Sequence, residues 1–294
     1  MAAGRFAPTP SGPLHAGSLI AAVASRCDAL SRGGLWQLRI DDIDPPRERA
    51  GAIESILATL ARHGLRHDGP IRRQSERLER YRDALRTLAA GDHLFRCRCT
   101  RRALRGEPLY PGTCRGRGLA PDEDGRLVAR PRAEPGDALR MRLAGRTRID
   151  DRVQGALEAE AGDTILRRRD GLVAYPLASA VDDADIERVV RGADLLEASA
   201  AQIEVLERLG HRPPAWAHVP VAVDERGEKL GKSTGAAPLD ALEPLPTLLG
   251  AWAFLGQAPL AVADLEAFWR EAPGRWSLAR VPRERTRPSP VIGA

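Results

Sequence analysis

The sequence predicts an α/β fold built around a parallel β-sheet. Short apolar stretches typical of strands alternate along the chain with stretches in which apolar residues recur at helical spacing. This alternation indicates strand–helix–strand units, whose strands run parallel. With 294 residues, 43% of them hydrophobic and 29% charged, the chain can bury one large core and hold a smaller inserted region. The composition excludes collagen-like, coiled-coil and wholly disordered proteins.

The N-terminal part of the chain supplies the first half of this sheet. A strand over 4–7 runs into a loop rich in proline and glycine and then into a helix over 14–30. A second strand over 35–40 ends at an acidic turn followed by two prolines. Amphipathic helices are then expected around 53–60 and 78–88.

The rest of the chain is expected to form an insertion, a second half of the sheet and a helical tail. Residues 119–136 combine prolines, glycines and charges of both signs, which predicts a weakly ordered surface loop. Strands are expected over 173–181 and 216–223 with a helix around 196–206 between them, and Pro220 predicts that the second strand lies partly at an exposed edge. The expected boundaries are 1–92 for the first half, 93–172 for the insertion, 173–243 for the second half and 244–294 for the short helical tail.

The charge balance favours a polyanionic partner without requiring one. Lys and Arg number 45 against 40 Asp and Glu, a net charge of +5. Aromatic residues make up only 4% of the chain, which disfavours a protein that stacks single-stranded bases on rows of Phe and Tyr. Recognition of a folded RNA by charge and shape is compatible with this composition.

The sequence predicts a cytoplasmic protein. Four cysteines in a chain of this length argue against a secreted disulfide framework, and Cys27 is interpreted as a small buried hydrophobic residue. The uncharged stretch 244–263 contains three prolines, so a membrane span is not expected there. The N-terminus lacks the basic start and long apolar core of a signal peptide.

A first candidate site lies where the first strand and its proline-rich loop lead into a helix. His15, Gly17 and Ser18 occupy the first turn, where free backbone N–H groups and the helix dipole favour phosphate. His15 can donate to a phosphate oxygen, and Gly17 lets a ligand approach the backbone. The alternative is a helix cap that contains a histidine by chance.

A second candidate site follows the last predicted strand. The only two lysines of the chain, Lys229 and Lys232, lie three residues apart in one short loop and precede Ser233. A lysine ammonium is a compact charge on a flexible stem, which can follow charge between phosphates better than the planar fork of arginine. The alternative is a chance pairing of two rare residues on a solvated loop.

A third candidate site is a cluster of Cys97, Cys99 and Cys114. Zinc favours four ligands such as thiolates in a tetrahedron, and the three cysteines supply three of them. The fourth ligand can be Tyr110, His93 or water, and the alternative interpretation is three buried free thiols. Around this cluster seven arginines face only Glu107, which suits RNA phosphates or a solvated surface equally well; they are Arg96, Arg98, Arg101, Arg102, Arg105, Arg115 and Arg117.

A His-x-Gly helix start paired with a Lys-x-x-Lys-Ser loop resembles the signature of class I aminoacyl-tRNA synthetases. Segments 5–11, 38–47 and 190–196 are similar to glutamate-binding segments of the glutamyl branch. The resemblance runs from about residue 4 to residue 240. It implies a class I synthetase fold with a Rossmann-like parallel sheet and an inserted zinc-binding subdomain.

Only 61 residues follow Ser233, so we expect no anticodon-binding domain of the kind that a full glutamyl-tRNA synthetase carries. The chain resembles instead the truncated paralogues of that branch, the glutamyl-queuosine tRNA(Asp) synthetase family. The resemblance implies a ligase that activates L-glutamate with ATP and Mg²⁺, transfers the glutamyl group to the queuosine base of tRNA(Asp), and holds one structural Zn²⁺. Its insertion would contact the tRNA. We expect a monomer.

The resemblance also implies roles for individual residues. His15 and Lys232 are the expected catalytic residues, which stabilise the transferring phosphates. Arg5 and Arg191 would hold the side-chain carboxylate of glutamate, and Asp41 its α-amino group. The whole expected glutamate pocket comprises Arg5, Phe6, Ala7, Pro8, Thr9, Asp41, Tyr175 and Arg191. The expected ATP site comprises His15, Gly17, Ser18, Lys229, Lys232 and Ser233, and the expected zinc ligands are Cys97, Cys99, Tyr110 and Cys114.

Three positions depart from the pattern of the branch. Asp41 stands where glutamate is usual, Ser18 where a second histidine is usual, and Gly231 where a serine is usual. Two other functions fit the same features. One is a glutamyl-tRNA synthetase without an anticodon domain that charges tRNA(Glu), and the other is a non-catalytic, zinc-stabilised RNA-binding protein.

Overall fold

The first half of the sheet forms as the sequence predicts. The structure is a computed structural model that describes residues 3–107, 109–116, 136–143, 145–230 and 239–289. Strands β1 (Ala3–Phe6), β2 (Leu35–Ile40) and β3 (Arg72–Arg73) pair in parallel in that order. The predicted second strand is confirmed residue for residue. The helices of this half are α1 (Ala16–Ser31), α2 (Ala52–Arg62) and α3 (Leu78–Ala90).

The second half continues the sheet on the other side of β1. Strands β9 (Arg188–Gly192) and β10 (Ala215–Val219) pair in parallel, and the Glu187 amide beside β9 donates to the Ala3 carbonyl at 3.1 Å. Strands β1 and β9 therefore lie side by side at the centre, where the two halves meet. In open α/β sheets ligands bind at the carboxyl ends of the strands beside such a switch point.

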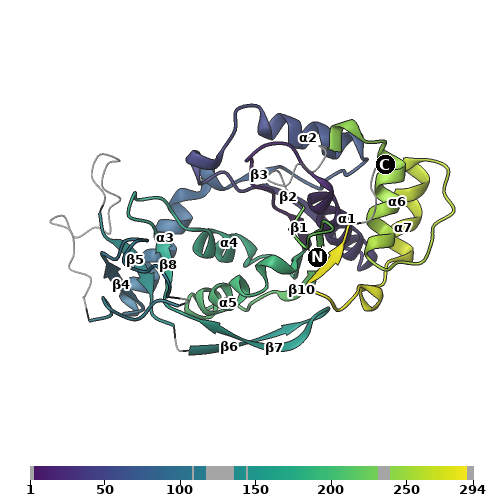
Figure 1. Cartoon of the computed structure of the whole chain (residues 1–294). Coiled ribbons are helices and arrows are strands. Elements are labelled where there is room, and N and C mark those ends of the chain that lie inside the picture. The colour runs from purple at the N-terminus through teal and green to yellow at the C-terminus, as the bar shows by residue number, and fades with distance from the viewer. Residues whose placement is uncertain (1–2, 108, 117–135, 144, 231–238, 290–294) are drawn as a thin grey trace.

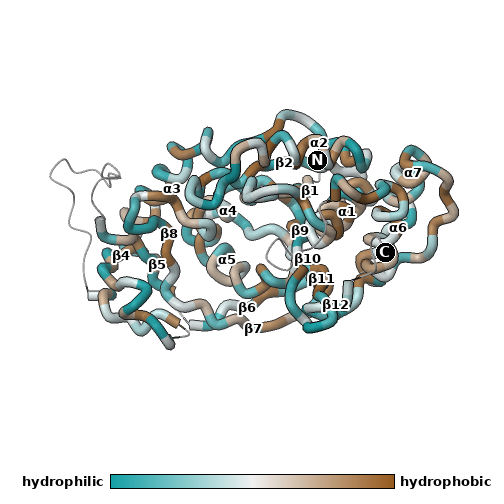
Figure 2. Tube along the Cα trace, turned by 45° about the horizontal axis from the view of Figure 1, so that its top comes forward, coloured by the Kyte–Doolittle hydropathy of each residue, from teal (hydrophilic) through white to brown (hydrophobic). Residues whose placement is uncertain are grey.

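Helix α1 packs closely on these central strands (Figure 1). Ala22, Val23, Ala24 and Cys27 are fully buried, which confirms the interpretation of Cys27. A Cβ atom on Gly4 of β1 would lie only 2.9 Å from Cβ of Ala29, so glycine is what permits this approach. The hydropathy view shows α1 as one of the most apolar segments of the chain (Figure 2).

The insertion contains two antiparallel units. Strands β4 (Leu94–Cys97), β5 (Ala138–Met141) and β8 (Thr164–Arg167) form a small sheet in the order β4-β5-β8. The hairpin of β6 (Gly145–Asp151) and β7 (Gly155–Ala161) extends toward the main sheet, where β6 pairs in parallel with β10 (Figure 1). Asp151, at the end of β6, is thereby brought beside Trp216 of β10 in the main sheet.

The C-terminal region packs against α1. Helices α6 (Pro244–Phe254) and α7 (Leu265–Arg275) both pack on α1, and β11 (Val221–Val223) pairs with β12 (Thr286–Pro288). Trp252 and Phe268 meet edge to face with ring centroids 6.0 Å apart. Among the residues described, no helix combines the length and the apolar character needed to cross a membrane.

Two expectations were wrong. Residues 173–181 do not form a strand, because helix α4 (Tyr175–Asp183) begins there, with Pro176 in its first turn, where proline is well tolerated. Residues 177–180 are buried, and an apolar run of this length fits either element. Residues 216–223 are buried rather than at an exposed edge, because β10 lies between β6 and β9 and Pro220 only separates β10 from β11. Helix α5 (Ala198–Arg208) confirms the helix expected around 196–206, whereas most of 119–136 lies outside the described residues.

Candidate active site

A cavity of about 580 Å³ opens at the carboxyl ends of β1, β2 and β9. Seven of the eight residues expected in a glutamate pocket line it: Arg5, Phe6, Ala7, Thr9, Asp41, Tyr175 and Arg191. Pro8 is the exception; it is buried, and its carbonyl accepts from the Asp41 amide at 3.0 Å, which ties the ends of β1 and β2 together. The fold therefore gathers residues from distant segments at one place.

One wall of the cavity is an acid-paired cluster of Arg5, Arg39, Asp41 and Asp183. Arg5 donates to both carboxylate oxygens of Asp183, from Nε at 3.1 Å and from Nη2 at 2.8 Å. Arg39 joins the two acids, with Nη1 2.7 Å from Asp183 and Nε 2.6 Å from Asp41. All four side chains are buried, so the two positive charges are matched by two negative ones inside the protein.

This pairing controls the ionisation of Asp183. Burial alone would raise the pKa of its carboxyl group, but the attraction of Arg5 and Arg39 and the hydrogen bond from Arg5 prevail. The pKa of Asp183 therefore lies far below its ordinary value of 3.8. Asp183 is a permanent anion at the end of α4, where the helix dipole by itself disfavours negative charge.

A second part of the cavity lining is a neutral-partner cluster around Arg191. Its guanidinium donates from Nη1 to the Tyr175 hydroxyl at 3.0 Å and from Nε to Nε2 of His218 at 3.0 Å. Nη2 donates to the Ser199 hydroxyl at 2.7 Å and to the Leu195 carbonyl at 3.1 Å. None of these four partners carries a negative charge.

Arg191 is thus a buried cation without a directly paired acid. Only 4% of its surface is exposed, and no carboxylate in the described parts of the chain lies within 4.0 Å of it. Burial lowers the pKa of Arg191, yet guanidinium remains protonated in proteins. Because a buried charge without a partner is costly, this side of the cavity favours an anionic ligand.

Behind Arg191, His218 is held by Asp151. Nδ1 of His218 lies 2.6 Å from Asp151 Oδ2, and both side chains are fully buried. Burial lowers the pKa of His218, and the positive charge of Arg191 acts in the same direction. The ring is therefore neutral, with Nδ1–H donating to Asp151 and Nε2 accepting from Arg191.

The expected phosphate site lies at the start of α1. His15 is the N-cap residue of α1, and its Nδ1 accepts from the Ser18 amide at 3.4 Å. A Cβ on Gly17 would lie 3.7 Å from the Leu230 carbonyl, and the Leu239 amide donates to the Leu14 carbonyl at 3.2 Å. Both described flanks of segment 231–238 therefore adjoin the first turn of α1.

Lys229 lines the same cavity and forms an ion pair with Asp194. Gly231, Lys232 and Ser233 lie outside the described residues. His15, Gly17 and Ser18 do not line the cavity itself, but Gly17 lies close to Leu230, the residue that follows Lys229.

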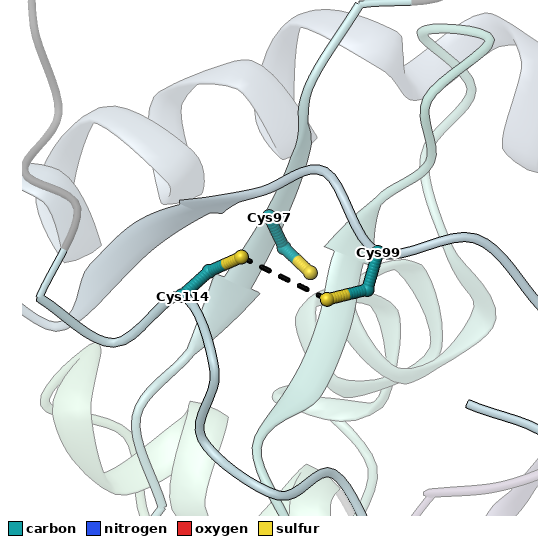
Figure 3. Close-up of side chains that lie close together, drawn as sticks. All are labelled: Cys97, Cys99 and Cys114. Atoms are coloured by element: carbon teal, nitrogen blue, oxygen red, sulfur yellow. Dashed lines mark hydrogen bonds between the residues drawn. The ribbon is translucent and has the colours of Figure 1, made fainter. Parts of the chain in front are cut away.

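The three insertion cysteines converge on one point (Figure 3). Their Sγ atoms all lie within 4.8 Å of one another, and Cys99 and Cys114 are 3.7 Å apart. The Tyr110 hydroxyl lies 3.5 Å from Cys97 and 3.7 Å from Cys99, and Nε of Arg140 donates to Cys97 at 3.3 Å. These three cysteines can hold a metal ion.

The distances fit the donors of a tetrahedral site, in which bonds of about 2.3 Å place sulfurs about 3.8 Å apart. Tyr110 is the nearest fourth donor among the residues considered from the sequence. His93 is not available, because it precedes β4 while Cys97 ends it, and four strand residues span about 13 Å.

The arginines around the cysteines differ in whether the protein already pairs their charge. Arg98 pairs with Asp137 at 3.0 Å, and Arg115 with Asp163 at 2.6 Å. Arg101, Arg102 and Arg105 are exposed, and Arg117 lies outside the described residues.

Sequence reasoning did not nominate Arg39, Asp183, His218 or Asp151 for the site. Arg39 stands among the apolar residues of strand 35–40, which is a weak signal of a buried charge, whereas Asp183 lies in the acidic run 182–187 and carries no such signal. Nothing local to β6 or β10 marks Asp151 and His218 as partners.

Comparison with known proteins agrees with this geometry. Residues 2–240 match the family model of class I tRNA synthetases (E and Q), catalytic domain. A glutamyl-Q tRNA(Asp) synthetase of Aromatoleum aromaticum is 47% identical, covering 96% of this chain and 90% of that protein. One of Shewanella amazonensis is 43% identical, covering 96% and 95%.

The fold is also found in a solved structure. The crystal structure of a glutamate tRNA ligase from Elizabethkingia meningosepticum superposes with a TM-score of 0.77 at 24% identity, over 98% of this chain and 67% of that one. The chain therefore belongs to the class I tRNA synthetases of the E and Q type and, within them, to the glutamyl-Q tRNA(Asp) synthetase family.

Proposed function

We propose that the protein activates L-glutamate with ATP and transfers the glutamyl group to the queuosine base of tRNA(Asp). The observation that carries this proposal is the 47% identity to a glutamyl-Q tRNA(Asp) synthetase over nearly the full length of both chains. The cavity supports it, because an anionic amino acid suits a buried arginine whose direct hydrogen-bond partners are all uncharged.

The reaction proceeds in two displacements. An α-carboxylate oxygen of glutamate bonds to the α-phosphorus of ATP, and pyrophosphate leaves. A hydroxyl of queuosine then bonds to the activated carbonyl carbon and loses its proton, and AMP leaves. In both steps the protein mainly positions the reactants and neutralises developing charge.

The cavity residues take the glutamate. Arg191, helped by Arg5, binds its side-chain carboxylate, and Asp41 accepts from its α-amino group. Tyr175 adds a hydroxyl beside Arg191. Phe6, Ala7 and Thr9 line the cavity between the ends of β1 and β2, and Pro8 supports them from behind through its bond with the Asp41 amide.

The start of α1 takes the phosphates. The backbone N–H of Gly17, the hydroxyl of Ser18, the ring of His15 and the ammonium of Lys232 stabilise the negative charge, with Lys229 and Ser233 in supporting roles. Mg²⁺ bound with ATP supplies further neutralisation of the phosphate oxygens. Replacing Lys232 with arginine is expected to abolish most of the ATP–pyrophosphate exchange; full retention would contradict the role of this lysine.

The cysteine site holds one structural Zn²⁺ through Cys97, Cys99, Cys114 and Tyr110. A closed set of four donors leaves no open position for catalysis. Elemental analysis of the purified protein should find about one zinc per chain, and Cys99→Ser should reduce that content. The exposed Arg101, Arg102 and Arg105 beside this site are the proposed contacts to tRNA phosphates.

The decisive experiment has two stages. ATP–pyrophosphate exchange is measured with each amino acid, with and without tRNA, and labelled glutamate is then offered to tRNA(Asp) with queuosine, tRNA(Asp) without it, and tRNA(Glu). Among the amino acids, we expect only glutamate to support exchange. Among the tRNAs, we expect only queuosine-containing tRNA(Asp) to become labelled. Label on tRNA(Glu) would indicate a glutamyl-tRNA synthetase instead, and absence of exchange with every amino acid would indicate a non-catalytic RNA-binding protein.

A further inference from the structure

The hydrogen bonds of Arg191 leave a defined part of its guanidinium for a ligand. An arginine has five N–H groups, and four are used on Tyr175, His218, Ser199 and the Leu195 carbonyl. The fifth is on Nη1, beside the Tyr175 hydroxyl. Since Tyr175 accepts from Arg191, its own O–H proton is directed elsewhere, so the pair offers two donors into the cavity that both residues line.

His218 decides how Arg191 is held. Nε2 of the ring accepts from Arg191 Nε at 3.0 Å, and it can do so only as a neutral imidazole with its proton on Nδ1. Asp151 fixes that tautomer by accepting from Nδ1 at 2.6 Å. Asp151 in turn accepts from the backbone amides of Val153, at 2.9 Å, and Gln154, at 2.8 Å, so it needs no arginine to remain ionised.

The imidazole therefore acts as a spacer between an anion and a cation. If Asp151 contacted Arg191 directly, it would neutralise the guanidinium as Asp183 neutralises Arg5. With His218 between them, the carboxylate orients the ring, the ring orients Arg191, and the positive charge remains available to a ligand.

We propose that Asp151 and His218 are a positioning pair that holds Arg191 as a donor-only site for the side-chain carboxylate of glutamate and thereby excludes glutamine. This rests on the proposed function, in which Arg191 binds that carboxylate. A glutamine side chain can satisfy two donors only through its single carbonyl oxygen, whereas a carboxylate has two oxygens.

Two substitutions separate the bond of the ring to Arg191 from its bond to Asp151; Nε2 also lies 3.2 Å from the Ser199 hydroxyl. In His218→Gln the side-chain oxygen can occupy the place of Nε2 and keep the bond to Arg191, whereas in His218→Asn the shorter amide reaches only the place of Nδ1 and loses that bond. Activity is measured as ATP–pyrophosphate exchange with glutamate and with glutamine. His63→Asn is the matched control, because His63 is also fully buried but bonds only to the Thr59 carbonyl, away from the cavity.

We expect His218→Asn to raise the KM for glutamate at least about tenfold, as for loss of a hydrogen bond to a charged group, and to leave the KM for ATP within about twofold. The same substitution should also reduce the preference for glutamate over glutamine. His218→Gln should stay within about threefold of the wild type, and His63→Asn should change only the unfolding temperature. Should His218→Asn not fold, His218→Leu carries the same expectation.

The outcomes are distinct. A wild-type protein that shows no exchange with glutamate would overturn the proposed function and the positioning role with it. Two outcomes with an active wild type would overturn the positioning role alone. One is a KM for glutamate that is the same in His218→Asn as in the wild type. The other is an increase in that KM that is as large in His218→Gln as in His218→Asn.

Discussion

The two walls of the cavity hold buried arginines in opposite ways. In the acid-paired cluster Arg5 and Arg39 contact Asp183 and Asp41, and the formal charges of the four side chains cancel. In the neutral-partner cluster Arg191 contacts two hydroxyls, a carbonyl and a neutral imidazole, so its charge is not cancelled by its partners.

The difference separates structure from binding. A buried ion pair that is complete within the protein contributes to the architecture, and breaking it destabilises the fold. A buried cation that only neutral groups hold is an incomplete pair, which a ligand completes. The pairing of Asp183 with Arg5 and Arg39 should therefore govern stability, and Arg191 should supply the charge that binds the side-chain carboxylate of glutamate, while Asp41 of the acid-paired cluster also receives the α-amino group.

The strongest test of this division is Arg191→Leu. Removing the cation takes away both its bond to the ligand carboxylate and the support of Tyr175, so kcat/KM for glutamate in the exchange assay should fall about a thousandfold or more, at roughly 4 kcal/mol or above. The KM for ATP should stay near that of the wild type. Retention of more than a tenth of the activity would place the binding charge elsewhere, with Arg5 as the next candidate.

The acid-paired cluster is tested by Asp183→Asn. Arg5 and Arg39 would then be buried without this shared carboxylate, so the free energy of unfolding in urea should fall by about 3–5 kcal/mol. Asp185→Asn is the matched control, because Asp185 is exposed two residues away and should change stability by less than about 0.5 kcal/mol. Equal effects of the two substitutions would show that Asp183 does not stabilise the fold through this pairing.

The two clusters should also respond in different pH ranges. The pKa of His218 in the folded protein lies below its ordinary value of 6.5. Below about pH 6.5 the unfolded chain therefore binds a proton at this histidine that the folded chain does not bind, and the free energy of unfolding falls as the pH drops. Its slope is at most about 1.4 kcal/mol per pH unit for this one proton. The pKa of Asp183 lies below 3.8, so its contribution is fully present above about pH 4 and is lost only in stronger acid.

Urea unfolding of the wild type, His218→Gln and Asp183→Asn from pH 3 to pH 8 tests this separation. His218→Gln should abolish the part of the slope between pH 5 and 6.5 that this histidine causes. The difference between the wild type and Asp183→Asn should be constant above pH 5 and shrink below pH 4. A slope near pH 6 that persists unchanged in His218→Gln would exclude His218 as its source.

Much of the fold was predictable because its signals are local. Proline, glycine and apolar spacing mark the loop after β1, helix α1 and strand β2 within a few residues of their ends. The hairpin of β6 and β7 carries no such signal. Its strands are buried on one face only, so charged residues such as Arg146 and Arg148 are frequent in them and apolar residues are few. Helix α4 was mistaken for a strand because it is buried and short.

The site divides in the same way. The cysteines and Tyr110 lie within 18 positions of one another, so their grouping could be seen in the sequence. Arg5 and Asp183 are 178 positions apart, and Asp151 and His218 are 67 apart, so only the folded sheet brings them together. The resemblance to a known family supplied Arg191 and Tyr175, but not the groups that hold them.

The smallest effect is expected at Asp41, where the branch usually has glutamate. Arg39 grips both oxygens of Asp41, at 2.6 and 3.2 Å, so Arg39 fixes the position of this carboxylate more than the length of the side chain does. Asp41→Glu should therefore change the KM for glutamate by no more than about threefold, with kcat unaltered. Asp41→Asn, which removes the charge that receives the α-amino group, should raise that KM about tenfold or more and shows that the assay senses this position. A tenfold change in Asp41→Glu would mean that the reach of the carboxylate, rather than its pairing with Arg39, sets the affinity on this wall.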